Sequence, residues 1–286
     1  MNIQYLKNII LDKVNAIPTV PHIIRRLIPM LHDENTPLHE VEQIISMDIA
    51  ISTRLLKVAN SAYYGFMKQV TTVRQALSVL GMRQVKSLAL GISVLESMKQ
   101  LSGRQTLDYR DLWLHSIGCA MAATLLCDVC NIPVKDTAFT AAILHDMGKI
   151  PLNGLFPDDY AQVIVLRDQN RSLADAESEI FGIDHGDVAG WLCDLWKFPT
   201  LLTDPIRNHH KTLSLADSPS VMTGIVCLAD YLSRAADIGC GGNNHDTAIP
   251  YPVCALLHLN PERLSELRNR LTTKKQQATS FVDATL

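Results

Sequence analysis

The sequence carries little charge, few aromatic residues and no excess of either charge sign. Charged residues make up 19% of the 286 positions, aromatic residues make up 6%, and the formal net charge is −3 with a pI near 6.3. General nucleic-acid binders usually show a basic face or a high pI, so this balance argues against that class. Apolar residues form 47% of the chain, which is typical of a globular protein with a well-buried core.

The sequence also lacks the features of a signal peptide and of a transmembrane run. Lys7, Asp12 and Lys13 interrupt the N-terminal segment, and no small-residue cleavage site follows an apolar run. The longest apolar stretch, residues 117–127, is too short to span a bilayer. We therefore expect a soluble, cytoplasmic protein without a membrane span.

Cysteine usage points to the same compartment. Seven cysteines, an odd number, are scattered singly through apolar segments, as expected for reduced thiols in a bacterial-type cytosol. Cys127 and Cys130 form one CxxC, but no second pair completes a four-thiolate zinc site. Both lie in a helical apolar pattern, so we interpret them as buried core thiols.

Helical periodicity dominates the chain. Apolar residues recur at i, i+3, i+4 and i+7 in residues 38–47, 51–60, 85–98, 112–129 and 222–235. No sustained alternation of apolar and polar residues with hairpin turns indicates a sheet. Pro21 and Pro37 stand near helix starts, where a missing N–H is harmless. The sequence predicts an all-α fold.

We expect the helices to form two packed bundles. Residues 1–103 would be a first bundle of about five helices, with a boundary near residues 102–105. Residues 104–259 would be the second bundle, and residues 260–286 a final helix followed by a polar tail. Residues 239–244 are rich in glycine and asparagine and are expected to form an exposed loop.

Polar residues interrupt apolar helices of the second bundle at a few positions. His115 and Asp230 each break an apolar run, and each needs a buried partner because desolvating it alone is costly. His145 and Asp146 end another apolar run, and Lys149 follows three residues after Asp146, on the same face if the helix continues. An ammonium beside a metal site is well placed to meet a phosphate oxygen.

Three further histidines extend this set into a candidate metal site. His185 opens a helix, and His209 and His210 close another. Imidazole and carboxylate ligands together suit Fe, Mn, Ni or Zn better than Mg, so we expect one or two divalent transition-metal ions. A second ion would use His185 and one of the paired histidines, with Asp146 as the bridge. The predicted metal ligands are His115, His145, Asp146, His185, His209, His210 and Asp230.

Simpler interpretations of these residues stay open at this point. His115 could be a hydrogen-bonded core histidine, and Asp230 could pair with Arg234 one helical turn on. The paired histidines His209 and His210 could complement a helix dipole. Lys149 alone could be a solvated surface charge.

The order of His115, His145-Asp146 and Asp230 resembles that of the HD-domain metal-dependent phosphohydrolases. Further stretches resemble the HDOD family, and the resemblance covers about residues 17–235. These stretches are IPTVP at 17–21, LLKVANSAYYG at 55–65, VRQALSVLG at 73–81, GWLCDLWKFP at 190–199 and IRNHH at 206–210. The resemblance implies an output module of bacterial signal transduction whose second bundle is HD-like. No added receiver or cyclic-nucleotide domain is found, so we expect a stand-alone HDOD protein.

The related HD-GYP phosphodiesterases, which hydrolyse cyclic di-GMP, share much of this order. Here the paired histidines are followed by KTLS at 211–214, with no acidic residue and no Gly-Tyr-Pro. This departure argues against cyclic di-GMP hydrolysis.

Two functions follow from the resemblance. In the first, the chain is a regulatory or scaffold module whose first bundle binds a protein partner and whose HD-like bundle holds a structural or sensory metal or a nucleotide. The rings of Tyr63, Tyr64 and Phe66 would then be partner anchors, or they would only staple neighbouring helices together.

In the second function, the chain is a metal-dependent phosphohydrolase acting on a nucleotide or another phosphoester, with Asp146 and Lys149 as catalytic residues. The metal would lower the pKa of a bound water toward about 7. His185, His209 or His210 would bind a second ion or act as acid or base.

Overall fold

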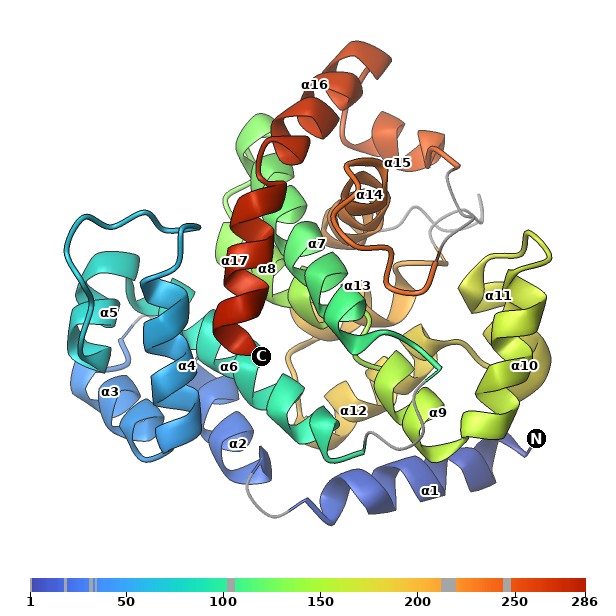
Figure 1. Ribbon diagram of the computed structural model, residues 1–286, viewed down its shortest axis with the longest axis horizontal. Helices are drawn as coiled ribbons and strands as arrows, with labels where there is room; N and C mark the ends of the chain where they lie inside the picture. The colour runs from blue at the N-terminus through green and yellow to red at the C-terminus, as the bar shows by residue number, and fades with distance from the viewer. Residues whose placement is uncertain are drawn as a thin grey trace.

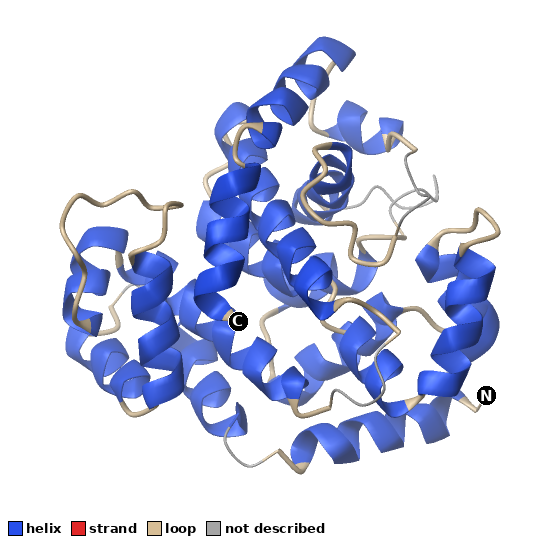
Figure 2. Ribbon diagram, in the orientation of Figure 1, coloured by secondary structure: helices blue, strands red, loops and turns tan. Residues whose placement is uncertain are grey.

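The computed structural model describes residues 2–17, 20–30, 33, 35–101, 106–211, 220–243 and 248–286. Within these ranges every regular element is a helix, which confirms the predicted all-α fold (Figure 2). The predicted boundary at residues 102–105 lies outside the described residues, so the division into two bundles stays a prediction. The helices are α1 (Ile3–Asn15), α2 (Val20–Met30), α3 (Leu38–Ser46), α4 (Ile49–Ala59), α5 (Val73–Leu80), α6 (Met82–Lys99), α7 (Tyr109–Val129), α8 (Lys135–Leu144), α9 (Lys149–Leu155), α10 (Pro157–Arg167), α11 (Leu173–Phe181), α12 (His185–Trp196), α13 (Thr200–Asn208), α14 (Val221–Ala235), α15 (Tyr251–Leu256), α16 (Pro261–Thr272) and α17 (Lys275–Thr285).

The N-terminal helices pack around aliphatic side chains. Helices α2 to α5 contact one another and α6, and their buried faces are formed by residues such as Val41, Ile45 and Leu55. Helix α6 also contacts α8 and α9, so it joins the two halves of the chain. Helix α1 lies apart from this group, along the lower edge of Figure 1, and packs against α9 and α12.

Helix α7 is the central helix of the second half. It contacts α8, α14, α16 and α17, and it is buried along most of its length. Among the described residues, α7 alone has the length and composition of a membrane-crossing helix, but 78% of its apolar window is buried inside the protein. Its hydrophobicity is therefore explained by its place in the core.

The C-terminus corrects one expectation. Residues 275–285 were expected to belong to a polar tail, but they form α17, which lies between α4 and α7 (Figure 1). Its buried residues Ala278, Phe281, Val282 and Thr285 follow the i, i+3, i+4, i+7 spacing of one helix face. Only three of these four are apolar, so the stripe is easily missed among polar neighbours.

The aromatic residues after α4 connect helices to one another. The ring of Tyr63 packs edge-on against Phe281 of α17, with ring centroids 5.7 Å apart. The hydroxyl of Tyr64 accepts a hydrogen bond from the Gln84 side chain of α6 at 3.1 Å. These contacts support the stapling interpretation of both rings.

Candidate metal centre

The seven predicted metal ligands lie together at the middle of the second half. Five helices bring them there from positions far apart in the sequence. His115 comes from α7, His145 and Asp146 from the end of α8, His185 from the start of α12, His209 and His210 from the end of α13, and Asp230 from α14.

The local backbone fixes where these side chains start. His145 caps the C-terminus of α8 with helical backbone angles, and Asp146 lies in the turn before α9. A Cβ added at Gly148 would lie only 2.0 Å from the backbone oxygen of His185, so glycine lets the start of α9 rest on the start of α12. A capping box between Asp184 and Asp187 sets the first turn of α12, which carries His185.

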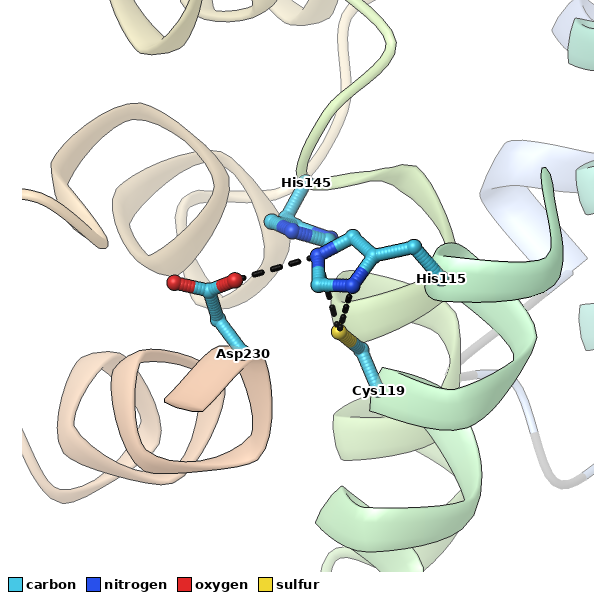
Figure 3. Close-up of side chains that lie close together, drawn as sticks. All are labelled: His115, Cys119, His145 and Asp230. Atoms are coloured by element: carbon cyan, nitrogen blue, oxygen red, sulfur yellow. Dashed lines mark hydrogen bonds and ion pairs between the residues drawn. The ribbon is translucent and has the colours of Figure 1, made fainter. Parts of the chain in front are cut away.

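The centre consists of two donor groups. The first donor group is His115, Cys119, His145 and Asp230, each of which offers one ligand atom within 4.8 Å of the others. Figure 3 shows these side chains converging from α7, α8 and α14, with Nε2 of His115 3.0 Å from Oδ1 of Asp230. All four side chains are buried.

The second donor group is Asp146, His185, His209 and His210, whose ligand atoms lie within the same 4.8 Å limit. Nε2 of His185 lies 3.0 Å from Nε2 of His210 and 3.3 Å from Nε2 of His209. Three ring nitrogens thus point at a common space.

Asp146 connects the two groups. Its Oδ2 lies 3.4 Å from Nε2 of His145 and 3.6 Å from Nε2 of His115. Its Oδ1 lies 3.1 Å from Nε2 of His185 and 3.9 Å from Nε2 of His209. One oxygen faces each group, which is the placement that a bridging carboxylate requires.

Hydrogen bonds at the outer ring nitrogens fix the protonation of the imidazoles. Nδ1 of His145 lies 2.7 Å from the backbone oxygen of Ala142, and Nδ1 of His209 lies 2.8 Å from that of Ile206. A carbonyl oxygen only accepts, so each Nδ1 carries the proton and each Nε2 turns a lone pair toward the centre. Such outer hydrogen bonds orient metal-ligating histidines in general.

His185 is held in the same manner by a carboxylate. Its Nδ1 lies 2.5 Å from Oε2 of Glu177, which is itself fully buried and also accepts from the backbone N–H of His185. The other carboxylate oxygen accepts a hydrogen bond from the hydroxyl of Tyr160 at 2.8 Å. Glu177 therefore fixes the ring of His185 from outside the centre.

The centre leaves buried polar atoms without partners in a way that a metal ion would remedy. Within the described residues, Nε2 of His145 and Oδ1 of Asp146 are buried and have no hydrogen-bond partner of acceptable geometry. Such orphaned groups are rare because each costs its desolvation free energy. The donor set fits divalent transition-metal ions.

Electrostatics keep most of these groups in their metal-binding forms. Burial lowers the pKa of His145 to about 4, although Asp146 opposes the shift. Burial and the neighbouring His210 hold the pKa of His209 well below its usual range. Burial works against the charged form of Asp146, but His145 and Lys149 outweigh it and hold the pKa of Asp146 well below its usual range. Neutral imidazoles and an ionised carboxylate are the forms that ligate metals.

His185 is the exception. Burial opposes its protonation, but the carboxylate of Glu177 outweighs burial and raises the pKa of His185 to about 9. A metal ion that bound to Nε2 of His185 would therefore displace a proton.

Two cations adjoin the carboxylates of the centre. Nζ of Lys149 donates to Oδ2 of Asp146 at 2.6 Å and to the backbone oxygen of Gly241 at 3.0 Å. Lys149 is only 1% exposed, so the interpretation as a solvated surface charge is wrong. Arg234 pairs with Oδ2 of Asp230 at 2.8 Å, so the helical ion pair exists in addition to the contact between Asp230 and His115.

The glycine-rich segment lies against the centre, which corrects its expected exposure. Gly241 is buried, and a Cβ there would lie 2.7 Å from the ring of His115 and 2.9 Å from Oδ2 of Asp146. The carboxylate of Asp111, in the first turn of α7, accepts hydrogen bonds from the backbone N–H groups of Cys240 and Gly241 at 3.1 Å. This anchor holds residues 239–243 over the donor groups, whereas Asn244 lies outside the described residues.

Two residues that the structure places at the centre, Cys119 and Glu177, are not among those predicted from the sequence. Cys119 follows His115 by four residues on the same helix, a spacing that places both on one face. Glu177 interrupts the buried stripe Leu173, Ala174, Ala176 and Phe181 of α11. Both signals are visible in the sequence once the partners are known.

Of the stretch after the paired histidines, Lys211 pairs with Asp187, and residues 212–214 lie outside the described residues.

Comparison with known proteins supplies the family context. A family model described as HDOD domain matches residues 17–212. An uncharacterized protein of Treponema pallidum is 22% identical over 283 residues, which cover 95% of this chain and 51% of that protein. The chain thus spans about half the length of this curated relative.

Three solved structures share the fold. An HDOD domain protein from Geobacter sulfurreducens aligns with a TM-score of 0.80 at 22% identity, over 99% of this chain and 97% of the other. A “Putative phosphohydrolase” from Shewanella amazonensis aligns with a TM-score of 0.76 at 22% identity, over 97% and 98% of the two chains. A “Putative signal transduction protein” from Marinobacter aquaeolei aligns with a TM-score of 0.79 at 19% identity, over 100% of this chain and 66% of the other. At these identities the likeness shows the fold alone.

Proposed function

This chain belongs to the HDOD domain family, and from that premise we propose that it is a signal-transduction module built around a buried pair of divalent transition-metal ions. The observation that carries the proposal is the placement of Asp146. Its two carboxylate oxygens face two separate donor groups, each with imidazole nitrogens turned inward. One ion would sit in each group, with Asp146 between them.

The chemistry of the donors favours transition metals over magnesium or calcium. Five of the predicted ligands are histidines, and hard ions such as magnesium prefer oxygen donors. Imidazole suits zinc, iron, nickel and manganese sites that also include carboxylates. The outer hydrogen bonds of His145, His185 and His209 would orient these ligands before any ion arrives.

Burial of the ligands supports a regulatory role. The side chains of His115, His145, Asp146, His185 and His209 are at most 2% exposed. A catalytic ion keeps an open coordination position for water or substrate, whereas a structural ion is enclosed by protein ligands. Ions held by these two groups would tie the ends of α8 and α13 to α7, α12 and α14, so metal occupancy would control how these helices pack.

A path for that control runs toward the N-terminal helices. Helix α7, which carries His115, contacts α17, and α17 contacts α4. Helix α8, which ends at His145, contacts α6, and α6 contacts α2 and α4. Metal binding could thus change the surface that the first hundred residues offer to a protein partner.

Lys149 favours a second candidate function, a metal-dependent phosphohydrolase acting on a nucleotide or another phosphoester. Its buried ammonium lies beside the bridging carboxylate, where it could stabilise charge on a phosphoryl oxygen. The bound metal would supply an activated water and polarise the phosphoryl group. The fold shared with the Shewanella protein is compatible with this function.

Metal analysis of the purified protein tests the proposal. We expect close to two equivalents of transition metal per chain after purification without chelator, and fewer in Asp146→Asn, which keeps the side-chain shape but lacks the charge that faces both groups. The matched control is Asp283→Asn, since Asp283 pairs with Arg110 on the surface and should not alter metal content. A wild-type protein that stays metal-free after incubation with zinc, manganese and iron would refute it.

Hydrolysis of bis-p-nitrophenyl phosphate separates the two candidates. Under the regulatory proposal the metal-loaded protein shows no turnover above that of Asp146→Asn. Turnover that disappears in both Asp146→Asn and Lys149→Met, with metal retained in Lys149→Met, would favour the phosphohydrolase.

A further inference from the structure

One cysteine stands among the donors of the first group. Cys119 lies on α7 one turn after His115, and its side chain is fully buried. Its Sγ lies 3.4 Å from Nε2 of His115, within the same 4.8 Å group as the ligand atoms of His145 and Asp230 (Figure 3). The thiol therefore points at the space where an ion of the first group would sit.

The contacts of Cys119 with His115 do not by themselves identify it as a ligand. Sγ lies within hydrogen-bond distance of both ring nitrogens of His115, at 3.4 Å from Nε2 and 3.8 Å from Nδ1. A buried cysteine often serves only as a small hydrophobe. Here, however, Nε2 of His145 also enters the group, is buried and has no hydrogen-bond partner within the described residues. The thiol of Cys119 and the unpartnered Nε2 of His145 thus lie in the same donor group.

We propose that Cys119 is a metal ligand. The two donor groups of the centre are then chemically different. The first donor group would offer one thiolate, two imidazoles and one carboxylate. The second would offer one carboxylate and three imidazoles. This inference rests on the proposed metal centre and adds to it which metal ions each donor group would prefer.

The thiolate gives the first group a preference for thiophilic ions. Sulfur donors favour zinc and cobalt over manganese, and four protein donors are the number that structural zinc sites use. Coordination forms a bond from sulfur to the ion, and the thiol proton passes to solvent; no electron is transferred. The second group, which has only nitrogen and oxygen donors, would also accept iron or manganese.

Cobalt titration of the full-length apoprotein tests the assignment. A cobalt–thiolate bond gives a charge-transfer band in the near ultraviolet, which nitrogen and oxygen ligands do not produce. We expect wild-type protein to develop this band as cobalt binds, and Cys119→Ser to lack it and to bind the first-group cobalt at least about tenfold more weakly. The matched control is Cys127→Ser, because Cys127 is buried on the same helix two turns further on but belongs to neither donor group.

The outcomes separate this inference from the proposed metal centre. Cobalt binding to wild type without the band, or a band that persists in Cys119→Ser, would overturn the thiolate ligand and leave the metal centre standing. If wild type binds no cobalt at all, both are overturned. Should Cys119→Ser not fold, X-ray absorption of zinc-loaded wild type decides: a sulfur neighbour at about 2.3 Å supports the assignment, and nitrogen and oxygen neighbours alone overturn it.

Discussion

The two halves of the molecule differ in the kind of side chain that their interiors bury. The helices α2 to α5 bury aliphatic side chains such as Val41, Ile44 and Leu55, which are stabilised by removal from water alone. The second half buries imidazoles, carboxylates and an ammonium at the meeting point of its helices. Such an interior is costly unless every polar group has a partner. Helices α2 to α5 thus meet through apolar faces, whereas the polar groups of the second half face one another, as the proposed metal pair would require.

Removal of metal should have the largest effect, and it should act on the second half. A ligand present at about 1,000 times its Kd stabilises the folded state by about 4 kcal/mol per site. We therefore expect chelation to lower the melting temperature markedly and to raise hydrogen exchange in α8, α13 and α14 more than in α3 and α4. Exchange measured by mass spectrometry with and without zinc checks this, and equal changes in both halves would contradict the comparison.

Leu55→Ala probes the other half. Leu55 is fully buried on α4, so its truncation should cost about 2–5 kcal/mol of unfolding free energy through lost burial and a cavity. We expect the variant to keep the metal content of the wild type. Denaturant unfolding and elemental analysis of the same samples provide the measurement, and loss of metal in Leu55→Ala would show that the first half helps to form the centre.

Glu177→Gln should weaken metal binding while sparing the fold. The amide can still accept from the backbone N–H of His185, but it lacks the charge that orients and polarises the ring. Loss of such an outer partner typically costs about 10–100-fold in metal affinity. Competition with a chelator of known affinity gives the value. Glu179→Gln is the control, because Glu179 lies on the same helix as Glu177 but forms an exposed ion pair with Arg171, and it should retain wild-type affinity.

Asp283→Asn should have the smallest effect. The pair of Asp283 with Arg110 links α17 to the start of α7, but both side chains are about half exposed. Exposed pairs contribute roughly 0–1 kcal/mol. We expect thermal unfolding of this variant to match the wild type closely at high salt. A larger loss would mean that the docking of α17 depends on this pair rather than on buried residues such as Phe281.

The sequence predicts the helices and the seven candidate ligands for different reasons. Long apolar stripes repeat every turn and make helices visible locally, as in α7 and α14. The ligands were visible because polar residues such as His115 and Asp230 break those stripes, and because their order resembles a known family. Their convergence depends on contacts between helices more than a hundred residues apart, which no local pattern specifies.

The missed features lack such a local signature. Cys119 reads as one more apolar residue of α7, since a buried thiol and a ligand thiol look alike in sequence. The exposed character expected of residues 239–243 followed from their composition, but Asp111 anchors their backbone against the centre. Helix α17 carries a short apolar stripe whose partners, α4 and α7, lie far away in the chain.

The contact at Gly148 has a consequence for how this centre can change over evolutionary time. Main chain touches main chain where α9 begins on α12, with no side chain to act as a spacer. The backbone approach between the turn that carries Asp146 and the helix that carries His185 is therefore set by the main chain. Under the proposed metal pair, substitutions of the ligands could change which ion binds, while the backbone around Gly148 kept its dimensions.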